Sequence, residues 1–84
     1  MLYYLIVCRS LTYAQRTATA LERTGIFARI LRSPKSISGE GCSHCVRVKR
    51  GDLDAALLAL RHVGLAPKRV FAAQQDGSYT EMPL

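Results

Sequence analysis

The sequence predicts a single α+β domain in which two helices cover one β-sheet. Three observations lead to this fold class. Short apolar runs alternate with helical segments in the order strand, helix, strand, strand, helix, strand. Each helical segment ends in the same Leu-x-x-x-Gly pattern, from Leu21 to Gly25 and from Leu60 to Gly64. The dipeptide Asp76-Gly77 is a strong hairpin signal near the C-terminus. The 84 residues suffice for one domain, 1–84, with one modest core.

The elements follow from hydrophobic periodicity and from capping residues. The run YYLIVC is typical of a buried strand. Thr12 and Gln15 form a capping box that would open the first helix, and Asp52 would cap the second. Residues 33–42 are expected to form a polar loop with two glycines. We expect strands over 3–8, 26–32, 44–49 and 68–74, helices over 12–24 and 53–63, and a last strand over 79–82.

This order predicts a ferredoxin-like βαββαβ two-layer sandwich with a short C-terminal hairpin extension. In that fold the first and third strands are antiparallel neighbours, and the first helix begins at the edge where the first strand ends. Residues distant in sequence should therefore meet at one rim of the sheet. They are Cys8, Arg9, Ser10, Cys42, His44, Lys68 and Arg69.

The net charge, the number of cysteines and the length of the apolar N-terminal segment limit the kinds of protein that this chain can be. The net charge of +6 suits a nucleic acid, an anionic small molecule or an acidic protein, although the basic residues are dispersed. Three cysteines, an odd number, argue against a secreted disulfide framework. The apolar start MLYYLIVC is too short to span a bilayer and lacks the features of a signal peptide. We therefore expect a cytoplasmic protein with reduced thiols.

Cys42 lies in a glycine-containing turn and is the strongest candidate for a reactive thiol. Gly39 and Gly41 allow backbone N–H groups to converge on an anionic sulfur. A helix N-terminus and nearby cations lower the pKa of a thiol, and the thiolate is the nucleophile. The expected thiolate-supporting residues are Arg9, Ser10, Gly39, Gly41, Lys68 and Arg69. Cys8, at the end of an apolar strand, is more consistent with a core position.

Other readings of the Cys42-x-x-Cys45 pair remain open. A structural zinc site needs four ligands, and the sequence has no second pair, so we expect no metal and no cofactor. A thioredoxin-type pair would begin a helix, whereas this pair leads into a strand. RNA-recognition domains of this fold stack bases on aromatic residues of the first and third strands. The third strand here has none, and Tyr3 and Tyr4 of the first strand are the only candidates. We therefore do not expect nucleic acid as a partner.

The segments YLIVCRSLTYAQR and LRSPKSISGEGCSHCVRV resemble the selenium/sulfur carrier protein-like family of short bacterial proteins. In that family a strand-helix-strand unit is followed by a proline, a serine-containing loop, a cysteine and a short apolar strand. The resemblance covers essentially the whole chain and implies that Cys42 is the carrier thiol. The residue after this cysteine is usually glycine in the family, and here it is Ser43.

These observations together predict a carrier that holds sulfur or selenium on Cys42 for delivery to a protein partner, rather than an enzyme. Donor and acceptor proteins are the expected partners. Cys45 and Cys8 are candidates for a resolving thiol that releases the cargo. The alternative is a small binding or regulatory module with structural cysteines, and a metal-binding module is the third hypothesis.

Overall fold

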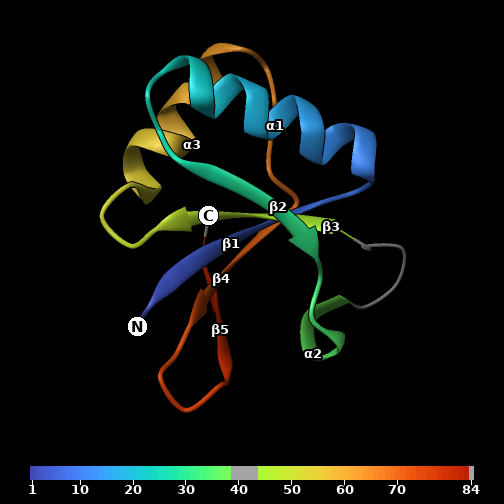
Figure 1. Cartoon of the computed structure of the whole chain (residues 1–84), viewed down its shortest axis with the longest axis vertical. Coiled ribbons are helices and arrows are strands. Elements are labelled where there is room, and N and C mark those ends of the chain that lie inside the picture. Colours follow the sequence, from blue (N-terminus) through green and yellow to red (C-terminus); the bar gives the residue numbers. More distant parts are fainter. Residues whose placement is uncertain (39–43, 84) are drawn as a thin grey trace.

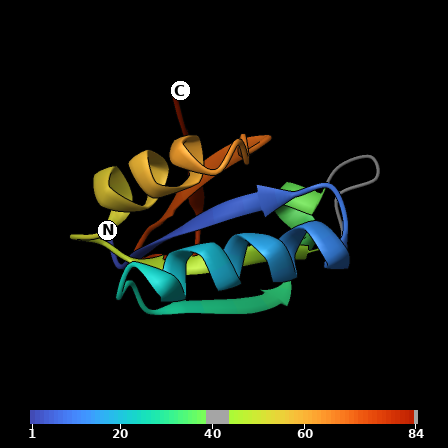
Figure 2. The same ribbon diagram turned by 90° about the horizontal axis from the view of Figure 1, so that it is seen from above.

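The computed structural model of the chain describes residues 1–38 and 44–83. One antiparallel sheet of five strands lies below two helices, α1 and α3, and the short helix α2 lies on the other side (Figure 1). The view from above shows α1 and α3 next to each other over the same face of the sheet (Figure 2). The α+β class predicted from the sequence is confirmed. The elements are β1 (Tyr3–Cys8), α1 (Leu11–Arg23), β2 (Ala28–Arg32), α2 (Lys35–Ser38), β3 (His44–Lys49), α3 (Leu53–His62), β4 (Arg69–Ala73) and β5 (Tyr79–Met82).

The strands lie in the order β2-β3-β1-β4-β5, with β1 in the centre. The expected pairing of the first and third strands is confirmed, because β1 pairs with β3 and brings Cys8 opposite His44. On its other side β1 pairs with β4, and Val7 lies opposite Arg69. The hairpin at Asp76-Gly77 is also present, and it adds β5 to the sheet beside β4.

The repeated Leu-x-x-x-Gly pattern has a structural explanation, because both long helices end in the same way. Gly25 and Gly64 adopt positive φ angles of 81° and 73°. The backbone N–H of the residue after each glycine donates to the carbonyl of the leucine, over 3.0 Å for Leu21 and 2.9 Å for Leu60. This is the Schellman motif, in which a glycine in the left-handed region lets the chain turn back at the end of a helix.

The structure corrects two predictions about local elements. The capping box of Thr12 and Gln15 is wrong: Ser10 is the N-cap of α1, and its hydroxyl accepts the backbone N–H of Tyr13 at 3.1 Å. Ser10 has the extended backbone of a cap residue, so the helix begins before Thr12. The predicted loop 33–42 contains α2 in its described part, where burial of Ile37 holds the helix against the sheet. Asp52 occupies the N-cap position of α3, as predicted, but its side chain forms no capping hydrogen bond.

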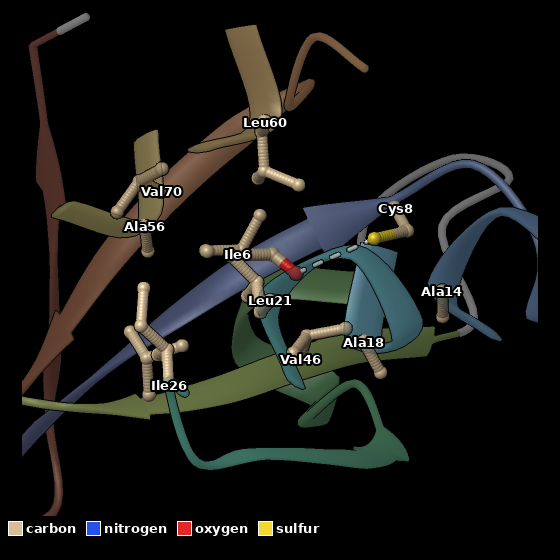
Figure 3. Packing of buried hydrophobic residues seen from close by; sticks show 11 residues of the cluster. Ile6, Cys8, Ala14, Ala18, Leu21, Ile26, Val46, Ala56, Leu60 and Val70 are labelled. Carbon is tan, nitrogen blue, oxygen red and sulfur yellow. Dashed lines mark hydrogen bonds between the residues drawn. The ribbon is translucent and has the colours of Figure 1, made fainter. Parts of the chain in front are cut away.

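Successive side chains of each strand point to opposite faces of the sheet, so buried side chains form one cluster on each face. On the covered face, below α1 and α3, aliphatic side chains such as Ile6, Val46 and Leu21 converge from strands and helices (Figure 3). On the open face, where α2 is the one helix among the described residues, a second cluster contains Leu5, Val7, Ile37, Cys45 and Phe71. None of the helices within residues 1–38 and 44–83 is long and apolar enough to cross a membrane.

Candidate functional site

Three of the predicted site residues, Cys42, Gly39 and Gly41, lie outside the described residues. Their roles stay predictions. The structure does describe the segments on both sides of them, since α2 ends at Ser38 and β3 begins at His44.

The predicted rim exists in part at the end of β1. The antiparallel register places Cys8 opposite His44. On the other side of β1, the backbone N–H of Lys68 donates to the carbonyl of Val7 at 3.3 Å. A cavity of about 470 Å³ opens at this place, and its lining includes Cys8, Arg9, Tyr13, Ala66, Pro67 and Lys68. The structure therefore brings Cys8, Arg9, His44 and Lys68 to one end of the sheet.

Cys8 is a core residue, as expected from its place at the end of an apolar strand. Its side chain is 2% exposed and lies on the covered face. The thiol lies 3.7 Å from the carbonyl oxygen of Ile6, the contact drawn in Figure 3, and 3.8 Å from Oγ1 of Thr17, and it can donate a weak hydrogen bond to either oxygen. Although Cys8 contributes to the lining of the cavity, its low exposure leaves little of the side chain open to a reagent or to a partner's sulfur in the folded protein.

Cys45 lies on the open face, opposite Val7 in β1 and Leu31 in β2. Alternation along β3 places Cys45 on one face with Arg47 and Lys49, but both of those are exposed, whereas Cys45 is 0% exposed. Burial raises the pKa of the Cys45 thiol to about 11, against a smaller lowering by the Ser33 side chain. Oγ of Ser33 is buried and forms no well-aligned hydrogen bond within the described chain, so this interaction is weak. At neutral pH Cys45 is therefore a neutral thiol.

The cations predicted to support a thiolate have different surroundings. Arg9 is exposed, and its Cζ lies 4.9 Å from the centre of the Tyr13 ring. Arg69 extends over the open face, where it forms two hydrogen bonds with the carboxylate of Glu81, at 2.7 and 2.9 Å. This ion pair holds the pKa of Glu81 below its usual value. Arg69 therefore does not share the covered face with Cys8, whereas Arg9 and Lys68 line the cavity beside it.

The comparison with known families identifies the chain. Residues 3–72 match the sequence model of the family described as "Putative Se/S carrier protein-like". The chain belongs to the Se/S carrier protein-like family. The matched range includes all three cysteines and every element from β1 to α3, whereas β5 lies outside it. Comparisons with curated proteins and with solved structures found no match.

Within the Se/S carrier-like chain, a metal ion has few candidate ligands. Among residues 1–38 and 44–83, no three side chains of His, Cys, Asp or Glu gather closely enough to hold one. His44 and Cys45 point to opposite faces of the sheet, because they are consecutive residues of β3. Cys42 lies outside the described residues, so a site that includes it stays untested.

Sequence reasoning missed several residues that shape the described rim. Tyr13 lines the cavity and lies under Arg9, and Thr17 contacts the Cys8 thiol. Both lie on the face of α1 that turns toward β1, at positions one turn apart. Their spacing of four residues places them on one face of any helix that spans both, so helical periodicity was the signal that could have paired them.

Proposed function

We propose that this protein is a carrier that holds sulfur or selenium on Cys42 and hands it to an acceptor protein. The observation that carries the proposal is the family match over residues 3–72, which includes Cys42. The protein would hold and pass on the cargo without transforming a substrate, so we propose that it is not an enzyme.

The environments of the other two cysteines support Cys42 as the carrier thiol. A carrier thiol must be accessible to two partner proteins, and it reacts as the thiolate. Cys8 and Cys45 are 2% and 0% exposed. With a pKa of about 11, only about one Cys45 thiol in ten thousand would be ionised at pH 7. Neither residue meets both requirements in the folded protein.

The transfer step needs no external oxidant. The Cys42 thiolate would attack the terminal sulfur of a donor persulfide. A new S–S bond forms on Cys42, the S–S bond of the donor breaks, and the donor cysteine leaves as a thiolate. A nucleophile on the acceptor then attacks the terminal sulfur, and Cys42 leaves as the thiolate. The same sequence applies to selenium, with a terminal selenium atom in place of sulfur.

Release by a resolving thiol is the second route. Cys45 or Cys8 would attack the inner sulfur of the Cys42 persulfide, forming a disulfide and expelling hydrosulfide. The protein would then need a thiol reductant to return to its starting state. Because both cysteines are buried, this route would also require local opening of the fold. We therefore place direct transfer to the acceptor first.

Two of the cations expected to favour a thiolate, Arg9 and Lys68, lie at one end of the sheet. We assign the core to the ferredoxin-like βαββαβ folds, with β5 as an addition. The neighbouring strands β2-β3-β1-β4 and the two helices on one face support this assignment. In such a frame Arg9 and Lys68 lie at the end of the sheet where β3 begins, and would favour a thiolate on the segment that precedes it.

Single-cysteine variants test the carrier function. The double variant Cys8→Ala/Cys45→Val keeps only Cys42, and Cys42→Ser keeps the other two thiols. Each is incubated with a cysteine desulfurase and cysteine, and then measured by intact mass spectrometry. We expect one added sulfur on the double variant and none on Cys42→Ser. Loading of Cys42→Ser at the wild-type level would refute the assignment of Cys42.

Alkylation separates the carrier from the alternative, a binding module with structural cysteines. In the folded protein Cys42 should react with iodoacetamide faster than Cys8 at neutral pH, by about tenfold for each unit by which its pKa is lower. A binding module would show no fast thiol and no sulfur loading. A metal-binding module would show a fast thiol only after chelation.

A further inference from the structure

The open face of the sheet carries a surface of rings and cations that the carrier function does not use. We call it the basic aromatic face and define it by Tyr3, Phe27, Arg29, Arg47, Lys49 and Tyr79. Arg47 follows Cys45 by two residues in β3 and therefore points to the same side of the sheet. The register places Arg29 of β2 directly opposite Arg47, and Tyr3 of β1 directly opposite Lys49. Tyr79 of β5 follows in the same row, opposite Ala73.

Cations lie over the rings of this face. Cζ of Arg47 lies 4.0 Å from the centre of the Tyr3 ring, and Nζ of Lys49 lies 5.7 Å from the centre of the Phe27 ring. Phe27 is 60% exposed, the largest exposure among the large hydrophobic residues of the described chain. An aromatic side chain this exposed contributes little to the core, so its contact with Lys49 is a surface feature.

The charges on this face are unbalanced. Arg29 and Arg47 are exposed and lie opposite each other on neighbouring strands, an arrangement that destabilises a sheet. Glu81 is the single acidic residue on the strands of this face in the described chain, and Arg69 holds it in an ion pair. Uncompensated like charges are consistent with a surface that meets an anionic ligand.

We infer that the basic aromatic face binds single-stranded nucleic acid. Phosphates would pair with Arg29, Arg47 and Lys49, and bases would stack on the exposed ring of Phe27 and on the guanidinium group of Arg47. An acidic protein would satisfy the cations but would give no role to the exposed ring of Phe27. The sequence argument against nucleic acid considered only the first and third strands, where Tyr3 and Tyr4 were the candidates. The structure adds Phe27, the residue before β2, and Tyr79 of β5 to Tyr3 on the same face. The face does not include Cys42, so this inference is independent of the carrier function.

Fluorescence anisotropy with a labelled twelve-nucleotide oligouridylate tests the inference. We expect a dissociation constant of roughly 1–100 µM at physiological salt, the range of non-specific binding. Three phosphate contacts would give a salt slope of about −2, or a loss of about 20-fold between 50 and 200 mM salt. Arg47→Gln/Lys49→Gln should reduce this slope to about −0.7. The control Arg16→Gln/Arg23→Gln removes the same charge from α1 and should leave the slope near −2.

A second pair of variants tests stacking separately from charge. Phe27→Ala should weaken binding about tenfold. Its control, Leu58→Ala on α3, removes an apolar side chain of similar exposure (55%) and should have no effect. Cys42→Ser should bind as the wild type does. The inference fails if the oligonucleotide does not bind at 50 mM salt, or if both charge variants lose affinity equally. It also fails if polyglutamate of equal charge competes fully while Phe27→Ala binds normally, because the face would then fit an acidic protein.

Discussion

The two faces of the sheet bury similar strand residues but are covered in different ways. On the covered face, Ile6 and Val46 pack against rigid helices through side chains such as Leu21 (Figure 3). On the open face, Leu5 and Phe71 are also buried, but long cationic side chains lie beside them as well as α2. Arg47 lies opposite Leu5 in the register, and Cζ of Arg69 lies 4.8 Å from the centre of the Phe71 ring. Packed helices fix a core, whereas flexible cationic side chains can move aside for a ligand. The comparison indicates that stability depends mainly on one face and that the other is available for binding.

The largest expected effect contrasts one residue from each face. Ile6→Ala should lower the free energy of unfolding by about 4 kcal/mol, because the helices above it cannot collapse into the cavity. Leu5→Ala should cost only about 2–3 kcal/mol, because the Arg47 side chain can relax into the space. Urea denaturation of both variants measures the difference. If Leu5→Ala costs as much as Ile6→Ala, the open face is packed as rigidly as the covered face.

The next effect concerns the pH dependence of the open face. Burial raises the pKa of Cys45 to about 11 from 9.0, so the folded state favours the neutral thiol. Its contribution to stability is complete below pH 9 and is lost as the pH rises toward 11. We expect a loss of about 2 kcal/mol relative to Cys45→Val, which has no thiol to ionise. Denaturation curves of both proteins between pH 8 and 11 isolate this effect from other titrating groups. Parallel curves would show that Cys45 is effectively solvated.

A smaller effect tests how the helices are held over the covered face. Gly25→Ala should destabilise the protein by about 1–2 kcal/mol, because Gly25 has a φ of 81° at the end of α1. Gly51→Ala is the matched control: a Cβ there meets no atom within 4 Å, and its φ is not positive. We expect the control to change stability by less than about 0.5 kcal/mol. Thermal unfolding compares the two, and equal losses would contradict the special role of the Schellman turn.

The smallest effect tests the start of α1, beside the cavity at the rim. Ser10→Ala should cost about 1 kcal/mol, because the backbone N–H of Tyr13 loses its acceptor. Thr12→Ala, at the position that the sequence suggested as a cap, should cost less than about 0.5 kcal/mol. Urea denaturation of the two variants decides between the caps. A larger loss of stability for Thr12→Ala than for Ser10→Ala would support the capping box of Thr12 and Gln15 instead.

Much of the fold was predictable because it depends on local interactions. The limits of β1 and β3 and the N-cap and C-terminal glycine of α3 follow from periodicity, Asp52 and Gly64, and all agree with the structure. Two neighbouring polar residues, Ser10 and Thr12, could both cap α1, and sequence spacing favoured the wrong one. The helix α2 was missed because four residues carry little periodicity, and it depends on the burial of Ile37 against the sheet.

The candidate site was less predictable for a similar reason. The register of β1 with β3 and β4 brings Cys8 together with His44 and Lys68, as the predicted topology implied. Whether a thiol is accessible and ionised depends on the side chains that bury it, and no local sequence pattern shows which side chains these are. Cys45 has polar neighbours in sequence, yet Leu5, Val7, Ile37 and Phe71 surround it from three other elements. The sequence likewise did not show where the Arg69 side chain points, because its ion-pair partner Glu81 belongs to the added strand β5.

The sequence by itself determined the α+β class, the order of the elements, the family and the cysteine to be tested, because turn chemistry, periodicity and short motifs act over a few residues. Only the tertiary structure decided which side chains from different strands share a face. Tyr3, Phe27, Lys49 and Tyr79 come from separate segments and share one face only when all five strands pair in register. The physical reason is that strand pairing joins residues across long stretches of chain, while burial and electrostatics depend on all the neighbours that this pairing brings into contact.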